Sequence, residues 1–185
     1  MQLGCNRWGP GQPYFFRKTP MKIPNRIIPL PGQESVWDYP RPPRLEISGK
    51  RIRVIFKGIV IADSTQAMRV LETSHPPVYY IPPADVRMDL MVRTNRSSYC
   101  EWKGPASYWS IVTESGRSEN AAWSYDSPTS SYSGIAGYLA FYPTRVDACY
   151  VDEEQVTAQP GDFYGGWITG DIVGPFKGDP ETWGW

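Results

Sequence analysis

The chain has 185 residues, of which 14% are aromatic, and its 19 basic and 19 acidic side chains give a formal net charge of zero. This length fits one domain with a buried core, and the 19 prolines and 17 glycines favour short strands joined by turns over a helical bundle. The charge balance argues against nucleic acid and membranes as partners. No run of about 18 apolar residues is present, which argues against a membrane span. The lack of a secretory signal predicts a cytoplasmic protein.

The chain is expected to divide into a Pro-rich N-terminal arm, residues 1–33, and a single β-rich domain, residues 34–185. The arm shows no hydrophobic periodicity, so we expect it to be extended. The first clear element of the domain is the segment 51–62, where apolar and basic residues alternate as in a half-buried strand. Lys57-Gly58 interrupts this alternation and predicts a hairpin turn, because glycine readily takes a positive φ.

Two short helices are expected after this hairpin. Asp63 followed three residues later by Gln66 resembles a capping box, and the apolar spacing beyond it predicts a helix over residues 64–71. Pro83 suits the first position of a helix, so a second helix is expected over residues 83–91.

Alternation returns in the second half of the chain. It predicts strands at 97–103 and 106–112 around a turn at 104–105, a strand at 121–125, and strands at 138–142 and 146–151 around a hairpin turn at 143–145. Residues 152–185 lose this periodicity, and their many rings predict an irregular, aromatic Gly/Pro-rich tail that packs on the domain or on a neighbouring subunit. The expected fold is mainly β (α+β): a compact antiparallel β-sandwich or open barrel with two short helices.

Seven segments in this order resemble a known family. They are WDYPRPPR at 37–44, IADSTQAMRVLET at 61–73, VYYIPPADV at 78–86, YCEWKGPASYW at 99–109, NAAWSYDSP at 120–128, YLAFYPTRVDACYVD at 138–152 and QPGDFYGGWIT at 159–169. Over roughly residues 35–185 the chain is similar to the uncharacterised domain-of-unknown-function family four-two-seven, which is loosely labelled a nucleotidyltransferase domain. The resemblance implies a compact β-rich domain akin to the β-tent group.

Several chemistries lack the residues that they need. No Walker-type or GxGxxG loop is present to hold phosphates, and no CxxC pair is present to hold a tent-type zinc ion. The only cysteines and histidine are Cys5, Cys100, Cys149 and His75, which we interpret as semi-buried thiols and a loop histidine. We therefore expect no metal and no cofactor.

Two carboxylates are the candidates for acid–base catalysis. Asp63 is also explained as a helix cap. Glu72 is the least explained, because it would lie at the C-terminal end of the expected helix, where the macrodipole disfavours an anion. We expect a compensating ion pair between Glu72 and a nearby arginine; the candidates are Arg44, Arg69 and Arg87.

The aromatic segment from Tyr99 to Trp123 is the predicted place of a functional pocket. Strands with Tyr and Trp at alternate positions can line one concave face that binds a small ligand. The predicted ligand-binding residues are Arg44, Glu72, Tyr80, Tyr99, Trp102, Lys103, Tyr108 and Trp123. Three functions stay open: a small-ligand-binding domain, an enzyme that uses Glu72 or Asp63 as acid or base in this pocket, and a homo-oligomeric protein assembled through its arm and tail.

Overall fold

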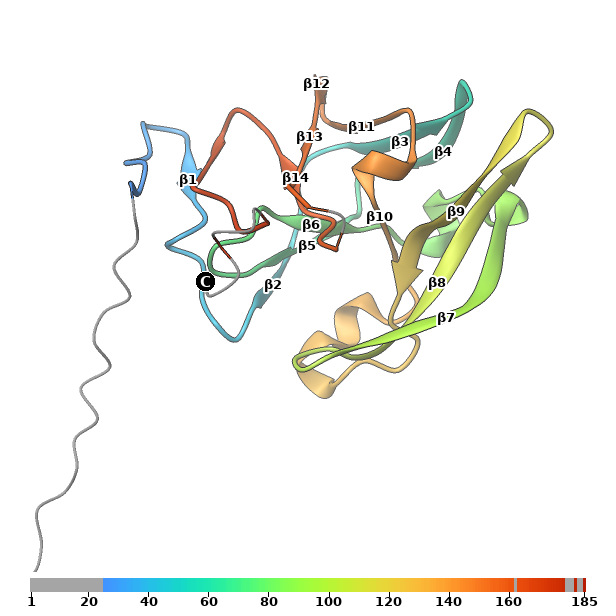
Figure 1. The fold of residues 1–185 in the computed structure, drawn as a ribbon, viewed down its shortest axis with the longest axis horizontal. Helices are drawn as coiled ribbons and strands as arrows, with labels where there is room; N and C mark the ends of the chain where they lie inside the picture. Colours follow the sequence, from blue (N-terminus) through green and yellow to red (C-terminus); the bar gives the residue numbers. More distant parts are fainter. Residues whose placement is uncertain (1–24, 162, 179–181, 183–184) are drawn as a thin grey trace, which may run out of the picture.

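The computed structural model describes residues 25–161, 163–178, 182 and 185, and the predicted arm lies mostly outside them (Figure 1). The strands are β1 (Glu34–Ser35), β2 (Arg44–Ile47), β3 (Ile52–Phe56), β4 (Ile59–Ser64), β5 (Met68–Leu71), β6 (Val78–Tyr80), β7 (Met91–Cys100), β8 (Gly104–Thr113), β9 (Gly116–Ser124), β10 (Leu139–Phe141), β11 (Ala148–Val151), β12 (Glu154–Gln155), β13 (Thr157–Ala158), β14 (Trp167–Ile168) and β15 (Ile172–Val173). The 3-10 helices are η1 (Pro83–Asp85), η2 (Met88–Leu90), η3 (Ser130–Ile135) and η4 (Pro143–Arg145). The fold is mainly β, as the sequence predicts, and none of these short helices could cross a membrane.

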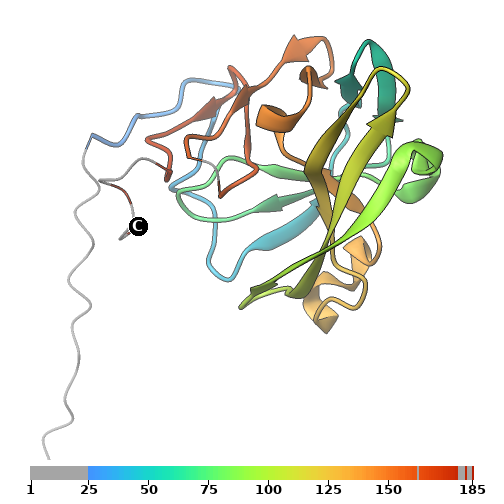
Figure 2. The same cartoon turned by 45° about the vertical axis from the view of Figure 1, so that its right-hand side comes forward.

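Two antiparallel layers face each other across the main core. One is the sheet β12-β11-β3-β4. The other combines β10-β9-β8-β7 with β2-β5-β6, because backbone hydrogen bonds of 2.8 and 2.9 Å between Ile81 and Leu139 join the two sheets. Figure 2 shows the long strands β7, β8 and β9 side by side. The described strands form no closed barrel.

The alternation of side chains between the two faces of each strand determines which residues each layer buries. Tyr79 and Ala122 point into the main core with residues of β3, whereas their neighbours Tyr80 and Trp123 belong to a second, aromatic cluster. Successive side chains of a strand point to opposite faces. The second cluster therefore lies on the face of the combined layer that is turned away from β3.

The predicted hairpin of β3 and β4 is confirmed. Ile52, Val54 and Phe56 are buried, and Lys57 and Gly58 take positive φ values of 52° and 72° at the turn. Two consecutive residues with positive φ are the geometry of the tight turns that suit the twist of paired strands.

The predicted helix over residues 64–71 is wrong. The segment turns after Ser64, whose hydroxyl accepts a hydrogen bond of 3.0 Å from the Gln66 backbone, and continues as β5. β5 pairs with β2 on one side and β6 on the other. A helix of two turns is marginal by itself, so pairing on both edges decides the conformation.

The second predicted helix is also wrong as one continuous element. Residues 83–90 form η1 and η2, separated by Val86 in an extended conformation. Val86 forms a β-bridge with Ala62, and the Arg87 backbone N–H donates to the Ile61 carbonyl over 2.8 Å. These bonds to β4 interrupt the helical ladder.

Two predicted turns also need correction. The β7–β8 turn comprises residues 101–103, and Gly104, with a φ of 93°, already pairs with Cys100 as the first residue of β8. β10 and β11 form no hairpin, because β10 pairs with β9 and β11 pairs with β3. η4 instead carries the chain from one layer to the other.

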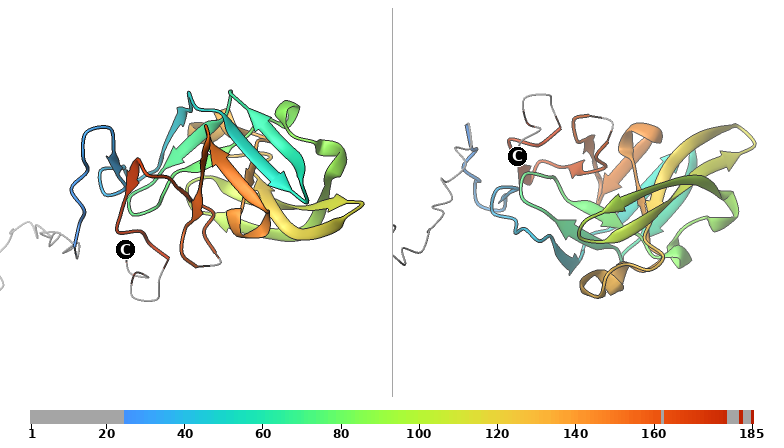
Figure 3. Two further views of the ribbon diagram at one scale, coloured as in Figure 1. Left: turned by 90° about the horizontal axis from the view of Figure 1, so that it is seen from above. Right: turned by 60° about the horizontal axis from the view of Figure 1, so that its bottom comes forward.

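The described part of the tail packs on the domain. Trp167 is fully buried in the main core, and its indole N–H donates to the Phe141 carbonyl over 3.0 Å. β15 pairs in parallel with β1, which places the tail beside the first described residues (Figure 3). A third small cluster there contains Val36 and Leu71.

Candidate functional site

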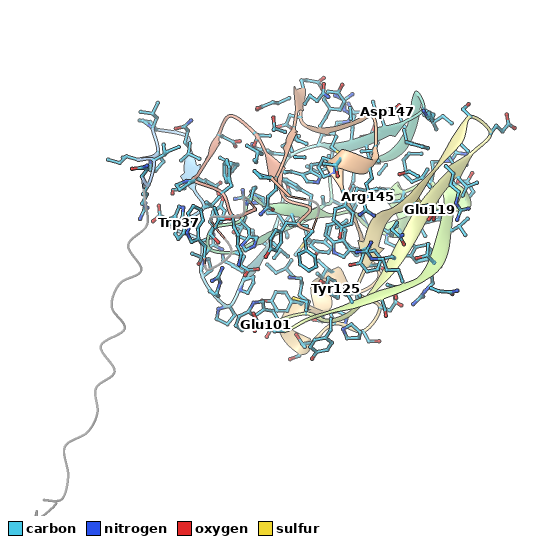
Figure 4. The ribbon with its side chains drawn as sticks, viewed as in Figure 1. Trp37, Glu101, Glu119, Tyr125, Arg145 and Asp147 are labelled. Atoms are coloured by element: carbon cyan, nitrogen blue, oxygen red, sulfur yellow. The ribbon has the colours of Figure 1, made fainter. Side chains whose placement is uncertain are left out.

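One pocket opens on the aromatic face of the combined layer and has a volume of about 410 Å³. Its walls come from β5, β6, β7, β8 and β9, from the β7–β8 turn, and from the tail around residue 164. The lining includes Glu72, His75, Val78, Tyr80, Ser98, Tyr99, Cys100, Glu101, Trp102, Lys103, Tyr108, Trp123, Tyr125, Tyr142, Phe163, Tyr164, Gly165 and Lys177. Figure 4 labels Glu101 at the tip of the β7–β8 hairpin and Tyr125 nearby.

The inner wall consists of rings with polar tips. The indole N–H of Trp123 donates to the hydroxyl of Tyr80 over 3.4 Å, and the Tyr108 hydroxyl shares a hydrogen bond of 2.9 Å with Ser98. Burial raises the pKa of the Tyr80 and Tyr125 phenols, so both stay protonated at neutral pH. The wall therefore offers hydroxyl donors and flat apolar faces.

Most of Lys103 is buried in this wall, with 7% of the residue's surface exposed, but its ammonium remains accessible to solvent. Its ammonium lies over the rings of Tyr125 and Tyr132, 5.7 and 5.6 Å from their centroids. Within the described part of the chain, no carboxylate, carbonyl or hydroxyl group hydrogen-bonds to this ammonium. Thr129 secures the turn, because its backbone N–H donates to the Lys103 carbonyl over 3.2 Å.

His75 is the second ionisable group in the wall, and it was not among the predicted ligand-binding residues. Its Nδ1 lies 3.0 Å from the Thr73 carbonyl, and its ring packs edge-on against Tyr164 at 4.8 Å. Burial lowers the pKa of His75, although the nearby charge of Glu72 opposes this shift. The neutral ring then carries its proton on Nδ1, which leaves the lone pair of Nε2 as an acceptor.

Glu72 lines the pocket but is already paired. Its carboxylate lies 3.3 Å from the Arg41 guanidinium. The prediction that Arg44, Arg69 or Arg87 would pair with it is wrong, since these arginines pair with Glu46, with Glu34 and Glu46, and with Asp89. Asp63 lies outside the pocket lining, on β4, and pairs with Arg51 rather than capping a helix.

The structure brings the predicted ligand-binding residues together in this pocket, with the exception of Arg44, which lies on β2. The lining residues that were not predicted include His75, Lys177 and Gly165. The one usable indication was that His75 is the only histidine of the chain. His75 is held in the loop between β5 and β6 by hydrogen bonds to Glu72 and Thr73, and the tail packs on it through Tyr164.

The mouth of the pocket carries exposed rings. Tyr99 at the end of β7 is 77% exposed, and Phe163 in the tail is 70% exposed and packs edge-on against Tyr164. Glu101 is also exposed at this mouth. Large apolar rings at an opening are typical of a surface that contacts a ligand.

Metal binding has no support among the described residues, where no group of three or more His, Cys, Asp or Glu side chains is placed to hold an ion. Cys149 is buried in the main core, whereas Cys100 is half-buried and lines the pocket. Cys5 lies outside the described residues.

The family comparison covers the strands that build most of the pocket. A family model described as a domain of unknown function (DUF427) matches residues 44–152, from β2 to the end of β11. The search of curated proteins found no match to the chain. The match includes Tyr80, Lys103 and Trp123, whereas the tail residues of the pocket lie beyond it.

Proposed function

This chain belongs to the family described as a domain of unknown function (DUF427), and from its pocket we propose that it is a small-ligand-binding domain. The observation that carries the proposal is a pocket of about 410 Å³ whose aromatic walls include polar groups left available to a ligand. Ligand pockets commonly measure about 300–1,000 Å³ and combine apolar walls with a few polar groups that set orientation.

The available polar groups distinguish this pocket from a packing defect. Both Lys103 and His75 line the pocket, and neither has a buried side-chain nitrogen that lacks a hydrogen-bond partner. The Lys103 ammonium has only ring contacts among the described residues, and the neutral form of His75 presents an unprotonated Nε2. A bound molecule would replace the solvent at these two groups.

We also propose that the protein acts in the cytoplasm. Cys100 and Cys149 are both free thiols, and unpaired cysteines fit a reducing compartment.

Native mass spectrometry of gently purified protein tests the proposal. We expect a bound small molecule that is retained by the wild type and by Val92→Phe, which changes a half-exposed residue of β7 outside the pocket lining. We expect its loss in Val78→Phe, which places a larger side chain in the pocket wall. A ligand-free wild type that also shows no thermal shift with a library of small planar molecules would contradict the proposal.

A further inference from the structure

We propose that the ligand is a small planar molecule with one carboxylate, and that the Lys103 ammonium binds this carboxylate. The inference rests on the proposed ligand-binding function and names the chemical class of the ligand. The observation behind it is the juxtaposition, in one pocket wall, of a buried lysine and a set of aromatic faces.

The Lys103 ammonium offers its donors to the pocket. Although most of the residue is buried, the ammonium remains accessible to solvent, because Nε of Arg53 is the one buried side-chain nitrogen or oxygen without a hydrogen-bond partner among the described residues. The rings of Tyr125 and Tyr132 attract the cation through their π faces, but they leave the three N–H donors of the ammonium without oxygen acceptors. An anion in the pocket would accept from these donors.

Two other cations at the pocket are already engaged, whereas the exposed Arg96 lies over the Tyr108 ring, 4.5 Å from its centroid, and is not part of the lining. The Lys177 ammonium donates to the Trp185 carbonyl over 2.6 Å, and Arg41 pairs with Glu72. Lys103 is thus the pocket lysine whose ammonium has no oxygen partner among the described residues. Glu101, two residues earlier, is exposed at the mouth and forms no ion pair with Lys103.

The charge of the pocket favours a monoanion over a phosphate. A phosphate would carry up to two charges, and phosphate sites usually surround these with several backbone N–H groups or arginines. This pocket instead offers one free ammonium, together with the carboxylates of Glu72 and Glu101 among its lining groups. A single carboxylate matches one lysine without strong repulsion from those acids.

The rings define the rest of the ligand. Tyr80 packs edge-on to Trp123 at 6.3 Å, and Trp123 packs against Tyr142 at 4.5 Å, so the wall is a continuous aromatic surface. Planar rings stack well on such surfaces. His75 Nε2 adds an acceptor for an N–H or O–H group of the ligand.

Matched pairs of acids and amides test the inference by isothermal titration calorimetry. The probes are benzoate with benzamide, nicotinate with nicotinamide, and indole-3-acetate with indole-3-acetamide. Each acid has nearly the shape of its amide but carries a negative charge. We expect at least one acid to bind about 10- to 100-fold more tightly than its amide, the range of a charge-assisted hydrogen bond.

Variants of Lys103 test whether this residue causes the tighter binding of the acid. Lys103→Met keeps an apolar stem and should abolish the advantage of the acid, whereas Lys103→Arg should retain much of it. Lys57→Met removes an exposed charge on the β3–β4 turn and should leave the advantage unchanged. Thermal unfolding of each variant establishes that it is folded.

The outcomes separate this inference from the proposed function. Amides that bind as well as acids, or an advantage that survives in Lys103→Met, would overturn the carboxylate assignment and leave ligand binding intact. Failure of every acid to bind the wild type would also overturn the assignment. The molecule retained in native mass spectrometry would then decide the proposed function independently.

Discussion

The indole nitrogen of Trp123 donates a hydrogen bond of 3.4 Å to the hydroxyl of Tyr80, and this bond ties β9 to β6 in the wall of the pocket. Both rings are buried, and Tyr80 also packs against Tyr125 at 6.2 Å. The two strands are separated in the layer by β10. The bond therefore links side chains across the pocket face rather than between adjacent strands.

Tyr80→Phe should destabilise the fold by about 1–2 kcal/mol, because it leaves the buried indole N–H of Trp123 without its acceptor. The measurement is the free energy of unfolding from urea denaturation. Tyr99→Phe is the matched control, since Tyr99 is 77% exposed and water solvates its hydroxyl; its effect should stay within about 0.5 kcal/mol. Equal effects of the two changes would show that the buried bond contributes nothing.

Gly165→Ala should disturb the pocket through direct contact with Trp123. A Cβ at this position would lie 2.8 Å from Cζ3 of Trp123 and 3.3 Å from Cδ1 of Tyr142, so the rings or the tail must move. Overpacking of this kind typically destabilises by about 1–3 kcal/mol.

The measurements for Gly165→Ala are urea denaturation and near-ultraviolet circular dichroism, which reports the surroundings of the tryptophans. Gly49→Ala is the control, because a Cβ at Gly49 meets no atom within 4 Å and the backbone there has no positive φ. If both variants unfold at the same urea concentration, the tail does not pack on Trp123 as described.

The sequence predicts secondary structure correctly where residues close together in the chain determine it. The wrong predictions fall where pairing with distant strands determines it. The β3–β4 hairpin depends on alternation and on Gly58, both of which are local. β5 has helical spacing, yet it is a strand because β2 and β6 pair with its two edges. No local pattern in β5 indicates this pairing, because it depends on which strands lie beside β5 in the folded sheet.

The site was predictable to a similar extent. Tyr108 and Trp123, which were predicted from aromatic alternation, line one pocket with Lys103. The partner of Glu72 was wrong, because Arg41 reaches it from the loop before β2. His75 and Lys177 come together only when the tail folds back, which spacing along the chain does not reveal.

Stability should fall as the pH decreases below about 6.5, and His75 should be the cause. Burial lowers the pKa of His75 below 6.5 in the folded state, with Glu72 opposing this shift and Lys177 and Arg41 adding to it. Above pH 6.5 the imidazole is neutral in both states. Below it, the unfolded chain binds a proton that the folded chain does not, so the free energy of unfolding decreases, by up to about 1.4 kcal/mol per pH unit.

His75→Asn provides the control for this pH dependence. The amide N–H₂ of asparagine can replace the Nδ1 donor toward Thr73, but it does not titrate. The chain has no other histidine. Burial of Asp171 opposes the lowering of its pKa, but Lys50 lowers it, and the net effect is a lowered pKa. Paired carboxylates of this kind lose their contribution to the free energy of unfolding only near or below pH 4. Urea denaturation between pH 5 and about 7.5 should give a slope for the wild type and none for the variant. An unchanged slope in the variant would exclude His75 as the source.

Cys100 and Cys149 should differ sharply in their reaction with iodoacetamide. Cys149 is 1% exposed in the main core, and burial raises the pKa of its thiol, so neither access nor ionisation favours its reaction. Cys100 is half-buried in the pocket wall. In the native protein Cys100 should therefore react first, and Cys149 only on unfolding.

Peptide mass mapping measures this difference, because it assigns the label to each cysteine separately and so distinguishes Cys5. A time course in buffer should modify Cys100, whereas the same time course in urea should modify both thiols, which controls for their intrinsic reactivity. Occupancy of the pocket should then slow the reaction of Cys100, since this thiol shares the wall with Lys103 and Tyr125. Equal rates for Cys100 and Cys149 in buffer would contradict the burial of β11, and a ligand that binds without slowing the Cys100 reaction would have to lie outside this pocket.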